Sequence, residues 1–274
     1  MESSEIIRTI IQDFPYALYG SMLVGALCAF IGVYIVAKRI VFLGAVLTQV
    51  SVLGIAITFL PMFAFVNHTL GSLLFTLIAV IVFSKLLTEK NIPKDAMLGF
   101  SFVFAIAFRI LIMQKTPKVE VAEIESLLRG DILFVVPETF YGMLAVFVVV
   151  MAMHVVFFKE FTYISFDAET ARAQGFRAGA WELLFYLTAG VVISVATHMV
   201  GDAFVFGFLI IPPIAALLLT RKVKHVFFVS MLIGALAPPI GLYLAFHFDF
   251  PSSPTMIAVA AVALVCAWGI RQTK

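Results

Sequence analysis

Charged residues are scarce in this sequence. Only 12% of its 274 positions are Asp, Glu, Lys or Arg, whereas 63% are hydrophobic. Soluble domains usually carry about a quarter of their residues as charged side chains. The chain therefore has too little charge to cover the surface of a soluble fold of this length, and we exclude a soluble globular protein.

Cysteine and basic clusters are scarce as well. Cys28 and Cys266 lie far apart within apolar runs, which indicates small packed residues rather than a disulfide. No run of Lys and Arg alternates with aromatic residues, so nucleic acid is not an expected partner. Acidic residues precede the first apolar run, and no small-residue cleavage pattern follows a basic start. We therefore expect no removable signal peptide.

What the sequence does contain is long apolar runs. A spanning helix needs about 20 mostly apolar residues, and uninterrupted runs exclude the alternating strands of a membrane barrel. We predict an all-α, polytopic transmembrane bundle of about 8–9 spans, with residues 1–274 forming a single domain. The candidate segments are 15–37, 43–62, 67–86, 95–113, 136–158, 181–200, 203–219, 225–246 and 254–271.

Two local features refine this bundle. Only Gly201-Asp202-Ala203 separates the sixth and seventh segments, so the number of crossings is eight if one of them is short or broken. Gly20, Gly25 and Gly32 lie in the first segment, where small residues permit close helix approach in a membrane. The first segment is therefore predicted to pack tightly against its neighbours.

The placement of Lys and Arg predicts the orientation. Basic residues follow segments one, three, five, seven and nine, whereas residues 61–66 and 247–253 contain none. Cytoplasmic loops are enriched in Lys and Arg, so we expect the amino terminus outside and the carboxyl terminus inside. The outer loop, about residues 114–135, breaks the trend with three basic residues, but acidic residues accompany them. It is long enough for a lid or a docking helix.

The cytoplasmic stretch 159–180 carries the signal of a short helix. Asp167 is a suitable N-cap, alanines favour a helix as far as Gln174, and Gly175 suits its end. Two interpretations stay open. The helix is either an interfacial connector between two spans or a surface on which a soluble partner acts.

Several mostly apolar motifs with polar residues at particular positions follow one another along the chain. They are RIVFLGAVLTQVSVLGIA (39–56), DAMLG (95–99), LLRGDIL (127–133), DAETARAQG (167–175), VGDAFVFGFLIIPPIAALLL (200–219) and DFPSSP (249–254). This ordered set resembles the permease subunits of metal-ion ABC importers, which take up zinc, manganese or iron. The resemblance runs from about residue 15 to residue 270.

The resemblance implies an assembly in the cytoplasmic membrane. Two permease copies, a homodimer, would surround a central path, with ATP-binding subunits on the cytoplasmic side and a substrate-binding protein outside. Residues of about 165–178 would form the coupling helix, in which Asp167, Ala171 and Gly175 seat against the ATPase. The chain itself would have no catalytic residue and no cofactor, and it contains no GxxxxGK[ST] phosphate loop.

The second span departs from the family pattern. Family members that carry zinc or manganese have an Asp directly after a Gly in this span and a His four residues later. Here Gly44 is followed by Ala45, and the later position is Gln49. A methyl group and a neutral amide cannot hold a transition metal in the way that a carboxylate and an imidazole do. The cargo is therefore an open question.

His198 and Asp202 are the candidate replacement. They lie four residues apart, and they share a helix face if the helix continues through Gly201. The functional interpretation places them along the translocation pathway as metal ligands. The structural alternative is a solvated or paired position at the outer interface.

Thr48, Gln49 and Ser51 form a second polar cluster. Thr48 and Ser51 can bond to backbone carbonyls of their own helix, whereas Gln49 needs a better partner than lipid, and we place the cluster toward the pathway. Arg109 is read as snorkelling from the outer end of its span to the headgroups. His68, His154, His225 and His247 are read as interface residues.

Three functional classes follow from these observations. The leading hypothesis is an ABC importer permease that moves a metal ion or a small metal-related solute by alternating access. A secondary transporter or channel without an ATPase would need ionisable groups near the bilayer midplane, where the spans are nearly bare. An intramembrane enzyme would need a convergent catalytic set, and no HExxH is present.

Overall fold

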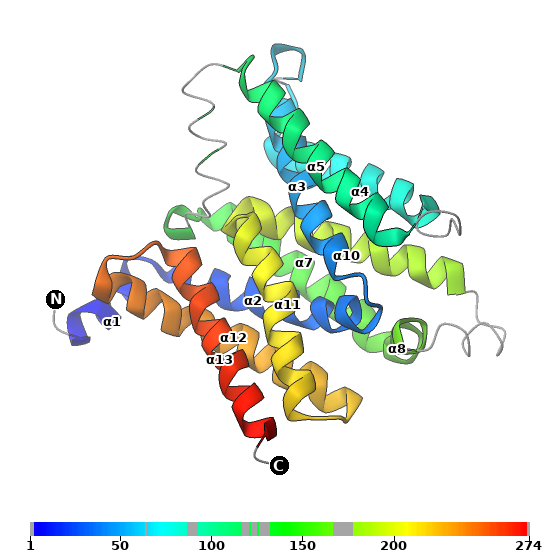
Figure 1. The fold of residues 1–274 in the computed structure, drawn as a ribbon. Helices are drawn as coiled ribbons and strands as arrows, with labels where there is room; N and C mark the ends of the chain where they lie inside the picture. Colours follow the sequence, from blue (N-terminus) through cyan, green and yellow to red (C-terminus); the bar gives the residue numbers. More distant parts are fainter. Residues whose placement is uncertain are drawn as a thin grey trace.

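Every regular element in the part of the chain that the structure describes is helical (Figure 1). The computed structural model describes residues 3–63, 65–86, 93–116, 121, 125, 132–166 and 178–272. Its elements are α1 (Ser3–Gln12), α2 (Pro15–Ala37), α3 (Val41–Thr58), η1 (Pro61–Phe63), α4 (His68–Leu86), α5 (Lys94–Met113), η2 (Ile132–Phe134), α7 (Pro137–Val156), α8 (Phe158–Phe166), α10 (Ala178–Val200), α11 (Asp202–Leu219), α12 (Val223–Phe248) and α13 (Ser252–Gln272).

The described residues contain nine helices that are long and apolar enough to cross a membrane. They are α2, α3, α4, α5, α7, α10, α11, α12 and α13, and each corresponds to one predicted segment. The shortest has 18 residues, and at about 1.5 Å per residue it still approaches the thickness of the hydrocarbon core. The all-α prediction is confirmed, with nine candidate spans.

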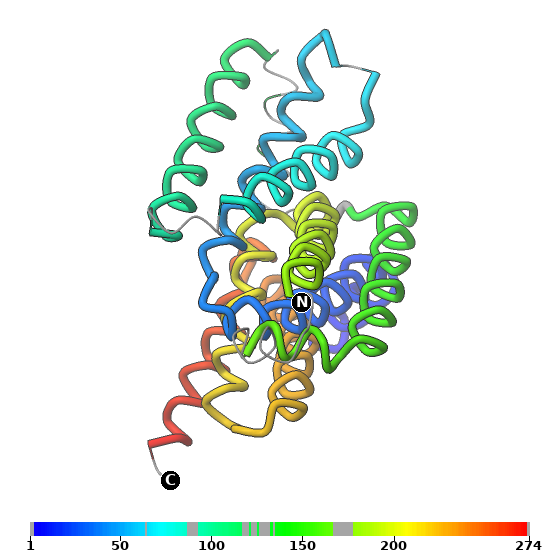
Figure 2. Tube along the Cα trace, turned by 90° about the vertical axis from the view of Figure 1, so that its right-hand side faces the viewer, coloured from blue at the N-terminus to red at the C-terminus, as the bar shows by residue number. Residues whose placement is uncertain are grey.

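The helices form two packed groups. In one group α2 packs most extensively against α12 and α11, and α13 lies against both of these helices. In the other group α3 packs against α4 and α5, and α4 also contacts α10. Figure 2 shows α4 and α5 at the top, well separated from α12 and α13 at the bottom. The spans α2 and α3 are mostly buried, whereas α5 and α7 expose most of their residues.

Glycines bring α2 into backbone contact with its neighbours. A Cβ atom on Gly25 would overlap the carbonyl oxygen of Gly234 in α12, and one on Gly32 would overlap the carbonyl oxygen of Leu209 in α11. Ser230 Oγ donates a hydrogen bond to the backbone oxygen of Ala29 at 2.9 Å across the same interface. The predicted close approach of the first span is confirmed.

The junction between the sixth and seventh spans is a single residue. Helix α10 ends at Val200 and α11 begins at Asp202, while Gly201 adopts a φ of 85°. Side chains with a Cβ rarely adopt that conformation, and glycine does so readily. One glycine therefore separates two full-length helices, and both α10 and α11 are candidate spans among the described residues.

The amino-terminal helix was not predicted. Helix α1 is amphipathic: Ile6 and Ile10 are buried, while Ile7 and Ile11 are about half exposed. It packs against α12 and α2, so its apolar stripe is partly covered by the bundle. The apolar-run criterion missed it because its ten residues are too short to span and alternate with polar ones.

We expect Gly25→Leu to destabilise the bundle by about 1–3 kcal/mol, because the added side chain must displace the backbone of α12. Thermal unfolding of the detergent-solubilised protein measures the effect. Gly142→Leu is the matched control, since a Cβ at Gly142 meets no atom within 4 Å. Equal melting temperatures for the two variants would contradict the close α2–α12 packing.

Candidate functional site

A hydrogen-bond chain joins three spans at the α10–α11 junction. Gln49 Nε2 donates to Asp202 Oδ2 at 2.7 Å, and Arg109 Nη1 donates to Gln49 Oε1 at 3.0 Å. Gln49 lies near the middle of α3, Arg109 in the last turns of α5, and Asp202 at the first position of α11. The amide of Gln49 thus lies between a cation and an anion and bonds to both.

The structure corrects the expectation for Arg109. Its side chain is directed to Gln49 rather than to the headgroups, and its Nε atom is buried with no hydrogen-bond partner in the described part of the chain. Burying a charge is costly unless an opposite charge compensates it. Asp202 supplies that charge through Gln49, which is why the guanidinium stays inside the protein.

The expectation that Gln49 needs a strong partner is met, but its neighbours in the sequence do not join it. Thr48 Oγ1 donates to the backbone oxygen of Ala45 at 2.9 Å, as a helix-internal hydroxyl does. Ser51 instead lies 2.7 Å from Ser72 Oγ in α4, which lies 2.7 Å from Ser194 Oγ in α10. All three serines are fully buried. This hydroxyl chain ties α3, α4 and α10 together within one helix group and is separate from Gln49.

His198 and Asp202 do not share a continuous helix. Gly201 ends α10 before Asp202, so the i, i+4 geometry that would place both side chains on one face is absent. The Nδ1 atom of His198 is buried and has no hydrogen-bond partner within the described ranges. Nor do the described residues contain a group of three or more His, Cys, Asp or Glu that could hold a metal ion.

His68 packs where the end of α3 meets the start of α4. Its Nδ1 atom is 2.6 Å from Thr58 Oγ1, and its ring stacks on Phe59 at a centroid distance of 4.2 Å. The contact joins the end of α3 to the start of α4. His68 is therefore a packing residue between these two helices, and its place at the membrane interface stays a prediction.

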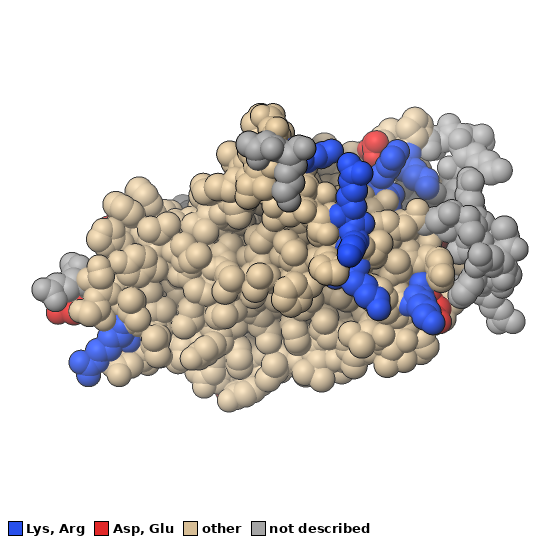
Figure 3. Space-filling model, turned by 90° about the horizontal axis from the view of Figure 1, so that it is seen from below, with Lys and Arg blue, Asp and Glu red and all other residues tan. Residues whose placement is uncertain are grey.

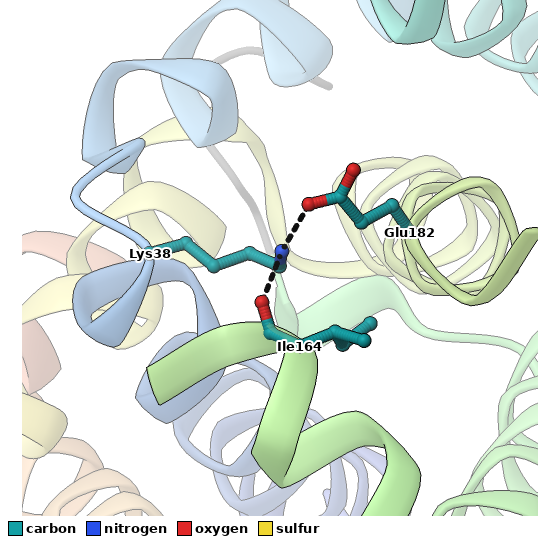
Figure 4. A network of polar contacts seen from close by, with 3 residues as sticks. All are labelled: Lys38, Ile164 and Glu182. Carbon is teal, nitrogen blue, oxygen red and sulfur yellow. Dashed lines mark hydrogen bonds and ion pairs between the residues drawn. The ribbon is translucent and has the colours of Figure 1, made fainter. Parts of the chain in front are cut away.

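A second polar network lies at the opposite ends of the helices. Lys38 Nζ donates to the backbone oxygen of Ile164 at 2.9 Å and forms an ion pair with Glu182 Oε1 at 3.2 Å (Figure 4). The Lys38 and Glu182 side chains are only 7% and 19% exposed. The network ties the end of α2 to the last turn of α8 and the first turns of α10.

Lys38 also has a structural role. Ile164 lies just before residues 167–177 and Glu182 just after them, so one side chain holds both flanks of that stretch. Asp167, Ala171 and Gly175, the predicted coupling residues, lie outside the described residues. Sequence reasoning missed this clamp, because Lys38 is 126 residues from Ile164 and 144 residues from Glu182 along the chain.

His154 corrects another expectation, because it is buried and not an interface residue. Its ring stacks on Phe161 at a centroid distance of 4.0 Å, and its Nε2 atom lies 3.1 Å from Thr188 Oγ1. Tyr34 and Phe185 pack around it. The stacking fixes α8 against α7 and α10, next to the Lys38 clamp.

Comparison with known proteins identifies the family. The family model "ABC 3 transport family" matches residues 11–270, which is nearly the whole chain. The chain belongs to the ABC 3 transport family. The resemblance seen in the ordered motifs is thereby confirmed, and the protein is a multi-pass permease of the ABC transporter type.

Individual relatives are distant but match over their full lengths. The chain is 24% identical to the "Probable iron transport system membrane protein" of Haemophilus influenzae, covering 96% of this chain and 93% of the relative. It is 28% identical to the "Manganese transport system membrane protein MntD" of Bacillus subtilis, with coverages of 90% and 88%.

The solved PsaBC structure from Streptococcus pneumoniae, in complex with Fab, superposes with a TM-score of 0.85 at 22% identity, covering 97% of this chain and 95% of the other. At that identity the match shows a shared fold. It therefore supports the helical architecture of the ABC 3 permease and leaves the roles of individual residues to the geometry of this chain.

We expect Gln49→Leu to destabilise this ABC 3 permease by about 1–3 kcal/mol, because it leaves Arg109 and Asp202 without their shared partner. The thermal midpoint of the purified protein reports the loss. Gln114→Leu, at the exposed end of α5, is the control. A Gln49→Leu protein as stable as the control would show that the chain of hydrogen bonds contributes little.

Proposed function

We propose that this chain forms the translocation pathway of an importer that moves a metal ion, or a small metal-related solute, into the cytoplasm. The observation that carries the proposal is the family match across residues 11–270. The names of the relatives, which refer to manganese and iron, support a metal cargo. Polar side chains at membrane depth mark ion and substrate paths by default, and Gln49, Arg109 and Asp202 are such side chains.

Thr48 and Ser51 are weaker pathway candidates than Gln49. Both are buried and hydrogen-bonded within the bundle, which favours a packing role. His198 remains a candidate for transient cargo contact, because its buried Nδ1 atom is without a hydrogen bond among the described residues. Asp202 and His198 lie on either side of the Gly201 break, where an irregular backbone at membrane depth is typical of transporter binding sites.

The energy source is proposed to be a separate ATP-binding subunit. The full sequence contains no phosphate-binding loop, so hydrolysis is assigned to a partner on the cytoplasmic side. Residues of about 165–178 are the proposed coupling helix, with Asp167, Ala171 and Gly175 at the contact. The Lys38 clamp supports this assignment, since a segment that transmits force needs firm attachment at both ends.

The orientation follows from the basic residues. In Figure 3 most of the visible Lys and Arg side chains gather toward one end, while most of the face in view carries no charge. We propose that this end is cytoplasmic, with the carboxyl terminus inside and the amino terminus outside. An extracytoplasmic substrate-binding protein would then dock near the outer loop of residues 114–135, and a second permease copy would complete the path.

Purification in mild detergent tests the importer proposal. We expect an ATP-binding subunit to co-purify with the chain, and the reconstituted complex to accumulate manganese or iron in proteoliposomes only when ATP is supplied on the cytoplasmic side. A permease that transports without any ATPase would instead support the alternative, a secondary transporter or channel. The same vesicles without ATP provide the control.

We expect Lys38→Met to uncouple ATP hydrolysis from transport. Without the clamp, the flanks of residues 167–177 lose a charged hydrogen bond and an ion pair. Transport per ATP hydrolysed should fall several-fold while the complex still assembles. Lys224→Met, an exposed lysine in the first turn of α12, is the matched control. An unchanged ratio in Lys38→Met would remove the clamp from the coupling mechanism.

A further inference from the structure

We propose that Arg109 is a tethered cation held at Asp202, and that a divalent cargo ion reaches Asp202 only by displacing it. This inference rests on the proposed function, because it assumes that the cargo is a cation. It assigns to Arg109 a specificity-determining role that neither the sequence motifs nor the family membership supplies. Three features of the site carry it: its charges, its occupied oxygen atoms and the exposed position of α5.

The first feature is charge balance. Arg109 and Asp202 carry opposite charges inside an otherwise apolar bundle, and Gln49 connects them by two hydrogen bonds. Each charge alone would be costly at this depth, and each makes the other tolerable. The charge of Asp202 therefore needs a nearby cation, which is either Arg109 or an ion that replaces it.

The second feature is the occupation of the oxygen atoms. A divalent ion such as Mn²⁺ is held by carboxylate and amide oxygens, with imidazole as a further suitable ligand. Here Gln49 Oε1 accepts from the guanidinium, and Asp202 Oδ2 accepts from the Gln49 amide. A guanidinium has only donors and no lone pair to offer an ion. With Arg109 in place, the two oxygens are already committed to N–H groups.

Departure of Arg109 changes this donor set. Gln49 Oε1 loses its donor, and rotation of the amide presents that oxygen beside the Asp202 carboxylate. A carboxylate and an amide oxygen suit hard divalent ions such as Mn²⁺. A divalent ion could therefore bind here only after Arg109 has left.

The third feature is the exposed position of α5 at the edge of the bundle. Helix α5 packs mainly against α3, and much of its surface is exposed: Phe100 is 70% exposed, and Val103 and Leu111 are both 64% exposed. Figure 1 shows α5 at the edge of the molecule, with α3 between it and α11. A shift of α5 would withdraw Arg109 from Gln49 without disturbing the buried core around α2.

Equilibrium binding of Mn²⁺ to the permease–ATPase complex in lipid nanodiscs tests the proposal, with the electron paramagnetic resonance signal of free Mn²⁺ as readout. We expect Arg109→Gln to bind Mn²⁺ at least about fivefold to tenfold more tightly, the range of a typical coupling between competing ligands. Arg109→Lys keeps the charge and should stay near the wild-type Kd. Lys94→Gln removes a charge from the cytoplasmic end of the same helix and is the control.

The gain must depend on Asp202. Adding Asp202→Asn to Arg109→Gln should abolish the tighter binding. If Arg109→Gln alone proves unstable, millimolar Mn²⁺ should raise its melting temperature toward that of the wild type, because the ion then replaces the missing guanidinium. Unchanged affinity in a folded Arg109→Gln protein would overturn the proposal, as would an unstable one that Mn²⁺ does not stabilise.

Transport separates this inference from the proposed function. If the wild-type complex accumulates metal with ATP but Arg109→Gln binds Mn²⁺ no more tightly, the importer stands and the tethered-cation role of Arg109 is overturned. If Arg109→Gln gains affinity while the wild-type complex moves no metal, the role of Arg109 is supported and the importer proposal fails.

Discussion

A lipid bilayer offers no water to polar groups, so every polar side chain at membrane depth must find its partner within the protein. In this chain that requirement is met with very few groups. Arg109, Gln49 and Asp202 bond to one another across three helices, and Lys38 bonds to Ile164 and Glu182 across three others. Each network fixes the relative positions of the three helices that it joins.

Between the networks, close packing replaces the hydrophobic effect. Lipid tails are as apolar as leucine side chains, so burying apolar surface against another helix gains little, and contact area and small residues decide which helices associate. Helix α2 shows this clearly, because Gly25 and Gly32 let the backbones of α12 and α11 touch it. Lys38 follows directly at its end. A movement of the segments held by Lys38 would thus be passed along α2 to its contacts with α11 and α12.

The sequence was sufficient to predict what depends on local pattern. Nine apolar segments became nine helices, and the need of Gln49 for a polar partner was met. What failed was pairing at long range. Arg109 was assigned to the headgroups because its position near a helix end favours snorkelling, and only the tertiary fold brings Gln49, which is 60 residues away in sequence, within reach. The prediction for His154 was wrong for a similar reason, since Tyr34 and Phe185, which complete its buried surroundings, come from helices distant in sequence.

The break at Gly201 explains the form of the network that joins Gln49, Arg109 and Asp202. A continuous helix would have paired His198 with Asp202 along one face. The positive φ of Gly201 instead starts a new helix at Asp202, where the free backbone N–H groups of the first turn also favour a negative charge. Asp202 can thereby bond to Gln49 in α3. The Gln49 amide donates a hydrogen bond to the carboxylate, whereas an imidazole or a carboxylate at position 49 would act as a further ligand for an ion. Gln49 and Arg109 therefore act together in this chain, because the neutral amide leaves the charge of Asp202 uncompensated and the guanidinium, bonded to the same amide, supplies the opposite charge.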